Sequence, residues 1–216
     1  MKSLKFAAAA LVCLSVIGSA GTGYSEIVLS NPFEQVGAIN ATVSGSNYFT
    51  TGFITGTDAN FLSLQSVNLS LATSGTAASV SPVVQLFSGT GSPTTLLGSF
   101  WSQTVAVTIP TSFAFNYLGS ASLLPSTNYW VVLSASAGQA FGWYTTDENP
   151  SAQNSSGYAF TSGKRSTNAG SSWVNSSAAA SGAVSITAVP EPSSIVLAGL
   201  GVLVAGYQLR RRMKRA

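Results

Sequence analysis

Residues 67–71 carry the sequence VNLSL, in which apolar and polar side chains alternate one by one. Successive side chains of an extended strand point to opposite faces, so this period of two gives a strand with one apolar face. The same alternation recurs at 105–109, 113–117, 129–133 and 184–186, and turn-forming Pro, Gly and Ser residues separate these segments. Many short strands without a helical period predict an all-β protein, an antiparallel β-sandwich of jelly-roll-like type.

The sequence divides into three parts. Residues 1–20 form a predicted signal peptide, residues 26–188 a single β-sandwich surface domain, and residues 189–216 a C-terminal sorting tail. The middle part holds roughly 165 residues, which is enough for one hydrophobic core. Its segment 149–181 is rich in Ser, Asn and Gly, so we expect long surface loops there with only short strand fragments.

The basic residues are concentrated at the two ends of the chain. The middle domain has only two of them, Lys164 and Arg165, beside five acidic residues, which gives it a formal charge of about −3. The whole chain, in contrast, has a net charge of +3. The basic character therefore belongs to the terminal segments, and we expect no nucleic-acid binding by the domain.

The sequence lacks residues on which most enzymes depend. It has no histidine, the commonest general base and metal ligand, and its one cysteine, Cys13, lies in the N-terminal apolar stretch. The adjacent acids Asp147 and Glu148 would point to opposite faces of an extended chain, and the Asn149-Pro150 pair that follows favours a solvated turn. We therefore expect a protein that is not an enzyme, with no catalytic residue, no metal and no other cofactor.

The N-terminus has the pattern of a secretory signal. Two lysines precede an apolar run at 6–17, which is shorter than a membrane-spanning helix. Ala20, with Gly18 two places before it, fits the small-x-small requirement of signal peptidase. We expect export through the translocon and cleavage after Ala20. Ser25 is a second candidate for the cleavage site, and an uncleaved anchor helix is the alternative.

The C-terminal tail has three parts in a fixed order. Val189, Pro190, Glu191 and Pro192 come first, and the two prolines oppose helix or sheet continuation, so we expect this motif to be extended and accessible. Residues 193–209 are apolar and would form a transmembrane helix about 25 Å long, slightly short of the ~30 Å hydrocarbon core. A cationic cluster then keeps the C-terminus in the cytoplasm, which leaves the domain outside. The cluster consists of Arg210, Arg211, Arg212, Lys214 and Arg215.

In this order, the three parts resemble the PEP-CTERM sorting signal of Gram-negative bacteria. In that family the tail is recognised by exosortase, a transpeptidase-like membrane protease, and such systems accompany exopolysaccharide and biofilm production. The resemblance implies a precursor inserted in the inner membrane and a mature protein at the cell surface or in the extracellular matrix. An ordinary single-pass membrane anchor is the alternative.

Residues 47–144 also resemble a bacterial extracellular module, the choice-of-anchor R domain. This resemblance implies a β-rich surface module with no assigned activity. The residues that carry it are Phe49-Thr50-Thr51-Gly52, Leu64 to Leu71, Val84-Gln85-Leu86-Phe87, Leu123 to Leu133, and Phe141-Gly142-Trp143.

Trp130 and Trp143 are the candidates for a ligand platform. Both lie in predicted strands, and flat exposed rings can stack on the apolar faces of sugars. The alternative is that both rings fill the core, the usual position of large aromatic side chains. We therefore expect a non-enzymatic exported protein, with a carbohydrate-binding module for the producer's own exopolysaccharide as the alternative.

Overall fold

A computed structural model gives the fold of the domain between the two terminal segments. Ser25–Val189 form one compact unit. No helix in the described part of the chain is long and apolar enough to cross a bilayer. The structure describes residues 26–31, 39–57, 62–72, 79–106, 111–119, 121–144, 153–154, 157–176, 184–190 and 204.

Sheet A has eight strands. Six of them follow one another across the sheet, and β9 and β10 pair with β4 beside that row. The row runs through β13 (Gln153–Asn154), β1 (Glu26–Asn31), β16 (Val184–Pro190), β4 (Leu62–Ala72), β12 (Ala140–Tyr144) and β2 (Ile39–Ser44), while β9 spans Thr111–Asn116 and β10 spans Ser122–Leu123.

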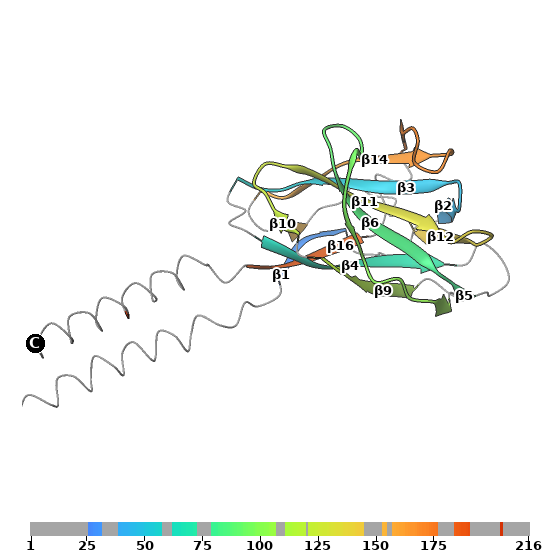
Figure 1. The fold of residues 1–216 in the computed structure, drawn as a ribbon, viewed down its shortest axis with the longest axis horizontal. Coiled ribbons are helices and arrows are strands. Elements are labelled where there is room, and N and C mark those ends of the chain that lie inside the picture. Colours follow the sequence, from blue (N-terminus) through green and yellow to red (C-terminus); the bar gives the residue numbers. More distant parts are fainter. Residues whose placement is uncertain are drawn as a thin grey trace, which may run out of the picture. The chain divides into compact units, whose positions relative to one another are not determined.

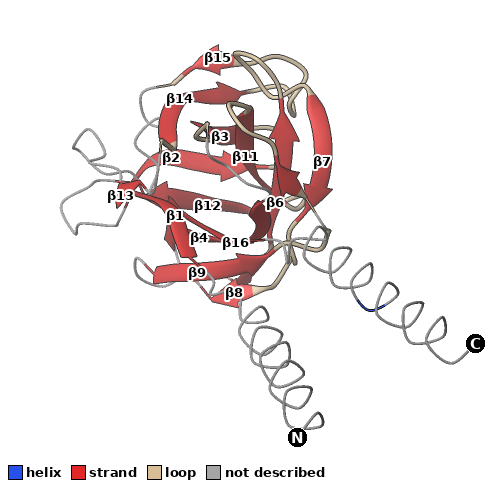
Figure 2. Ribbon diagram, turned by 90° about the vertical axis from the view of Figure 1, so that its left-hand side faces the viewer, coloured by secondary structure: helices blue, strands red, loops and turns tan. Residues whose placement is uncertain are grey.

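Sheet B has six strands and lies opposite sheet A, so that the two form separate layers (Figure 1). Figure 2 shows the two layers from the end of the domain. A third, two-stranded sheet joins β5 (Ser79–Val80) to β8 (Val105–Ala106). The order in sheet B is β15 (Val174–Asn175), β14 (Ala159–Ser166), β3 (Tyr48–Ile54), β11 (Asn128–Ala135), β6 (Pro82–Ser88) and β7 (Thr95–Ser99).

The strands pair over long distances in sequence, and four of the pairs are nested within one another. β1 pairs with β16, β3 with β14, β4 with β12, and β6 with β11, each in antiparallel register. The pair of β2 with β12 crosses this nesting, because β2 precedes β3 and β12 precedes β14. The all-β class and the antiparallel sheets that the alternation predicts are confirmed.

One hydrophobic core lies between the sheets. Sheet A contributes Leu69 and Ile186, and sheet B contributes Phe53 and Leu133, each fully buried. Phe53 also stacks on Tyr129, with 5.5 Å between the ring centroids. Burial of one such side chain stabilises a fold by about 1.5–3 kcal/mol. The apolar positions of the alternating segments therefore determine which face of each strand points inward.

The strand β14 is longer than the sequence predicts. The sequence predicts loops with short strand fragments at 149–181. In the structure, eight residues of this segment form the strand β14, which pairs with β3. Most side chains of this strand are polar, so it has no apolar period to reveal it. Backbone pairing with β3 supports it instead, interrupted by a register shift between Phe160 and Gly163.

Candidate functional site

The predicted sorting motif begins inside the last strand of the domain. Val189 is half-buried in β16, and Pro190 is the last residue of that strand. Ala188, just before the motif, is fully buried and pairs with Glu26 of β1. The motif therefore follows the folded domain without a spacer, and the first and last strands of the domain meet at this end.

The other residues predicted to act in export and sorting lie outside the described part of the chain. They are the signal cleavage site Ala20, the motif residues Glu191 and Pro192, the apolar segment 193–209, and the cationic cluster at 210–215.

Trp143 does not form a surface platform. Its side chain has no exposed surface and belongs to the core between the sheets. In sheet A it lies between Leu71 of β4 and Ala41 of β2, two core residues that pair with it from either side. The prediction of a sugar-binding ring at this position is wrong, because a ring inside the core has no face to offer.

Trp130 is buried on the outer face of sheet B, which corrects the second half of the platform prediction. Its side chain is 1% exposed, and its indole Nε1–H donates to the carbonyl oxygen of Gly89 at 2.8 Å. Gly52 on the neighbouring strand β3 leaves room for the ring. The Lys164 ammonium lies 5.8 Å from the ring centroid and donates to Asn175 Oδ1 at 2.7 Å. Neighbouring groups therefore cover this ring, and it is closed to a ligand.

Within the described part of the chain, Trp101 is a large exposed aromatic residue that sequence reasoning missed. Its side chain is 60% exposed, and no alternating pattern or motif in the sequence distinguishes it. The structure shows why it is exposed. Phe100 forms an antiparallel bridge with Tyr117, and successive residues of an extended chain alternate in direction. Since Phe100 is buried, Trp101 points outward.

Two backbone hydrogen bonds hold Trp101 in place. Its own N–H donates to the Asn116 carbonyl at 2.7 Å, and the Leu118 N–H donates to the Ser99 carbonyl at 3.0 Å. Together with the bridge between Phe100 and Tyr117, these bonds form a short ladder. We call this ladder, residues 99–101 with 116–118, the closing ladder, because it connects the edge strand β7 of sheet B to β9 of sheet A.

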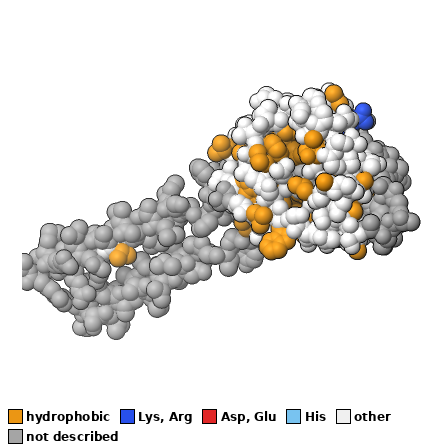
Figure 3. Space-filling view, turned by 45° about the vertical axis from the view of Figure 1, so that its right-hand side comes forward, with side chains coloured by type: hydrophobic (Ala, Val, Ile, Leu, Met, Phe, Trp, Pro, Cys, Tyr) orange, Lys and Arg blue, Asp and Glu red, His pale blue; other side chains and the backbone are white. Residues whose placement is uncertain are grey.

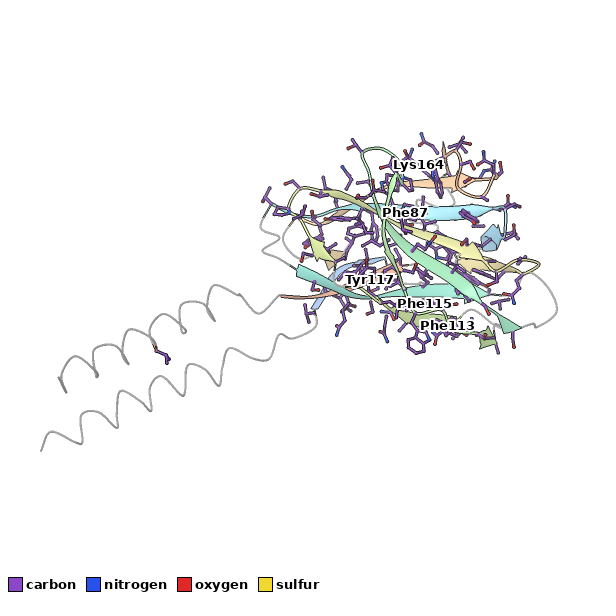
Figure 4. The ribbon with its side chains drawn as sticks, viewed as in Figure 1. Phe87, Phe113, Phe115, Tyr117 and Lys164 are labelled. Carbon is purple, nitrogen blue, oxygen red and sulfur yellow. The ribbon has the colours of Figure 1, made fainter. Side chains whose placement is uncertain are left out.

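The inner side of the closing ladder is packed with aromatic rings. Phe100 and Tyr117 meet edge to face, with 5.1 Å between their ring centroids. Phe113, Phe115 and Tyr117 follow one another at every second position, so they share one face, and Phe115 is fully buried in the core (Figure 4). Burial raises the pKa of the Tyr117 phenol above its ordinary value. The ladder is therefore held rigidly from inside, while its outer side is open to solvent.

The segments that form the closing ladder carry no charged side chain. Residues 59–146 contain no Asp, Glu, Lys or Arg. Figure 3 shows apolar side chains scattered among uncharged ones, with a basic side chain at the upper right. Among the described residues, no three Asp, Glu or Cys side chains come together in a way that could hold a metal ion. The contacts that this surface can offer a ligand are hydrogen bonds and apolar contacts.

A comparison with protein families gives a match at the C-terminus. The family model described as the PEP-CTERM protein-sorting motif matches residues 188–212. No curated protein matches the chain, and no solved structure matches it. The matched residues include the predicted motif Val189–Pro192 and the first three arginines of the cationic cluster. The chain therefore carries a PEP-CTERM sorting motif, which implies an exported protein directed to the cell surface, with exosortase as its processing partner.

Proposed function

We propose that this protein is a non-enzymatic component of the cell surface or extracellular matrix. Its precursor enters the inner membrane through the tail and is then processed by exosortase. The observation that carries the proposal is the sorting-motif match at 188–212, directly after the last strand of the domain. Within the tail, an apolar segment and a cationic cluster follow the motif in the order that membrane insertion requires.

The position of the motif supports its recognition by an enzyme. Proline has no backbone N–H and keeps φ near −65°, so Pro190 and Pro192 oppose continuation of either a strand or a helix. We therefore expect the segment between the domain and the apolar segment to be extended and accessible. Glu191 provides a negatively charged carboxylate in this segment, which a processing enzyme can recognise. Val189 and Pro190 still belong to β16, so the enzyme has to work close to the end of the domain.

The remaining parts of the proposal concern the cellular setting. Export through the translocon and cleavage by signal peptidase after Ala20 would deliver the domain to the outside. A Gram-negative host and a link to exopolysaccharide or biofilm follow from the sorting system that the tail implies. The resemblance of residues 47–144 to the choice-of-anchor R module also stays a prediction, and it agrees with a surface module without catalytic chemistry.

The test replaces Pro190-Glu191-Pro192 with three alanines in the producing cells. The apolar segment and the cationic cluster stay intact, so we expect normal insertion but accumulation of full-length precursor in the inner membrane. Deletion of the exosortase should give the same accumulation. The readout is the mass of the protein and its distribution between membrane and surface fractions.

A proline replacement elsewhere provides the control. Pro125 is exposed in the turn before β11, so Pro125→Ala should leave processing unchanged. Mature wild-type protein with an intact C-terminus would show that the tail is a plain anchor. Normal processing of the alanine variant would show that the motif is not recognised.

The alternative, a carbohydrate-binding module, no longer has its two predicted rings, because Trp130 and Trp143 are both buried. A different surface has to carry any binding of sugars.

A further inference from the structure

We propose that the outer side of the closing ladder binds a neutral polysaccharide. Trp101 provides the stacking ring, Leu118 the apolar flank, and Asn116 with Ser99 the hydrogen-bonding groups. Only the source of the polysaccharide depends on the proposed location at the cell surface. Binding itself does not require that the protein is sorted.

The register of the ladder places these four side chains on one side. Antiparallel pairing sets Trp101 opposite Asn116 and Ser99 opposite Leu118, on either side of the bridge. Side chains that lie opposite each other share a face, with Cβ atoms about 5 Å apart, and diagonal neighbours are about 7–8 Å apart. Trp101 and Leu118 are such diagonal neighbours. Their side chains therefore lie on either side of one small area on the outer surface of the closing ladder.

This area differs from an ordinary scatter of exposed apolar side chains. Trp101 is 60% and Leu118 63% exposed, and Leu97, two residues before Ser99, is 42% exposed. Single exposed apolar residues are normal, whereas exposed apolar side chains that gather on one surface are a feature of interaction sites. Burial of a tryptophan ring in the core would stabilise the fold, so its exposure at this position costs free energy.

The surface is also fixed in advance. The ladder's hydrogen bonds of 2.7 and 3.0 Å hold the backbone of Trp101 and Leu118, and the packed Phe100–Tyr117 pair supports it from inside. Gly98 lies directly against the Tyr117 hydroxyl, where a side chain would collide. A ligand that stacks on a prearranged ring loses less conformational freedom of the protein on binding.

Polar groups beside the ring suit the hydroxyl groups of a sugar. Asn116 is exposed opposite Trp101, and its amide can both donate and accept. Gln103 continues the same side of the chain, and its Nε2 donates to the Ala114 carbonyl at 3.0 Å, which orients its amide. A sugar ring has an apolar face for the indole and hydroxyl groups around its rim for these amides.

Charge decides which polysaccharide fits. No charged residue occurs between 59 and 146, so the segments that form the ladder offer no partner for the carboxylate of an acidic sugar. The Lys164 ammonium on sheet B is engaged with Asn175 and the Trp130 ring. Anionic lipid headgroups would equally require basic residues. A neutral sugar chain needs only stacking and hydrogen bonds.

The experiment uses the exported protein purified from producing cells. Affinity electrophoresis in gels that contain hydroxyethylcellulose, galactomannan or dextran tests neutral polysaccharides, and gels with alginate or polygalacturonate test acidic ones. We expect retardation by at least one neutral polymer and by neither acidic one. Trp101→Ala should weaken that binding about tenfold or more, which corresponds to the loss of one stacked ring. Salt should change the affinity little, because no ion pair is involved.

Matched variants separate binding from folding. Leu124→Ala removes a side chain that is 54% exposed elsewhere, and it should bind as the wild type does. Asn116→Ala removes the amide but keeps the backbone carbonyl that accepts from Trp101, so it should weaken binding with an unchanged melting temperature.

Several results would overturn the proposal. These are retardation by none of the neutral polymers, stronger retardation by an acidic one, and full binding by both Trp101→Ala and Asn116→Ala. A shift of the wild-type protein from dimer to monomer in Trp101→Ala, without a change in sugar binding, would identify a second copy as the occupant instead. Failure here leaves the processing of the tail unaffected, because that is read from the mass of the protein in cells.

Discussion

At the scale of single residues, the outer face of sheet B depends on a glycine. A Cβ at Gly52 would lie 2.6 Å from Cζ3 and 2.8 Å from Cε3 of Trp130, and it would also collide with Thr161 Oγ1. The ring has little room to move, since its Nε1–H is bound to Gly89. We expect Gly52→Ala to destabilise the fold by about 1–3 kcal/mol, as other overpacked sites do. Thermal or urea unfolding measures this.

Gly45→Ala is the matched control for Gly52→Ala. The nearest atoms to a Cβ at Gly45 are 3.7–4.0 Å away, an ordinary contact distance. The control should therefore unfold close to the wild type. Equal stability of the two variants would contradict the close packing of Trp130 on Gly52.

Tyr117 gives a residue-scale prediction about pH. Its pKa lies above the ordinary 10.0 because burial disfavours the phenolate. The stabilising contribution is therefore complete below pH 10 and is lost as the pH rises through the folded-state pKa. Tyr117→Phe keeps the ring against Phe100 but cannot ionise. Between pH 9 and about pH 11.5, we expect the melting temperature of the wild type to fall more steeply than that of the variant. Parallel curves would refute this.

Trp130 also shows what an alternating pattern cannot reveal. The sequence correctly places Tyr129 and Trp130 on opposite faces of one strand, and Tyr129 does belong to the core. A period of two does not say whether the second face meets solvent. Here Lys164 and Asn175 come from strands far along the chain. The exposure of Trp101 likewise depends on Asn116 and Tyr117, which are distant in the sequence. Local sequence therefore predicts neither the burial of Trp130 nor the exposure of Trp101.

At the scale of elements, the alternating strands were predictable and the polar ones were not. The segments 67–71 and 129–133 lie within β4 and β11 and turn their predicted apolar residues inward. β14 has no such pattern, because its place is determined by hydrogen bonds to β3. Backbone pairing between distant strands produces no periodic pattern of apolar residues in a single sequence.

The strand β16 carries an element-scale prediction. It lies inside sheet A between β1 and β4, and it contributes the core residues Val184, Ile186 and Ala188. A chain that ends at residue 183 loses these contacts and the strand that joins β1 to β4, so we expect it to be unfolded and sensitive to protease. A chain that ends at residue 190 keeps the whole strand and should show a cooperative β-type unfolding transition by circular dichroism. Cooperative folding of the shorter chain would show that β16 is dispensable.

At the scale of the whole molecule, the separation of charge from the domain predicts the orientation of the proposed membrane-inserted precursor. Lys164 and Arg165 are the basic residues of the domain, whereas five follow the apolar segment 193–209. Basic residues beside an apolar helix stay on the cytoplasmic side of the membrane. In intact spheroplasts, we therefore expect external protease to reach the chain up to Pro192, while a tag after Ala216 stays protected.

Replacement of Arg210, Arg211 and Arg212 with serine tests the cause of this orientation. The number of basic residues that we expect to hold the C-terminus inside then falls from five to two, so a fraction of the tags should become accessible to protease. Lys164→Ser with Arg165→Ser removes basic residues from the domain and should leave the tag fully protected. Digestion of the wild-type tag in intact spheroplasts would show that the orientation is reversed. Equal protection in both variants would mean that Arg210, Arg211 and Arg212 are not needed for the topology.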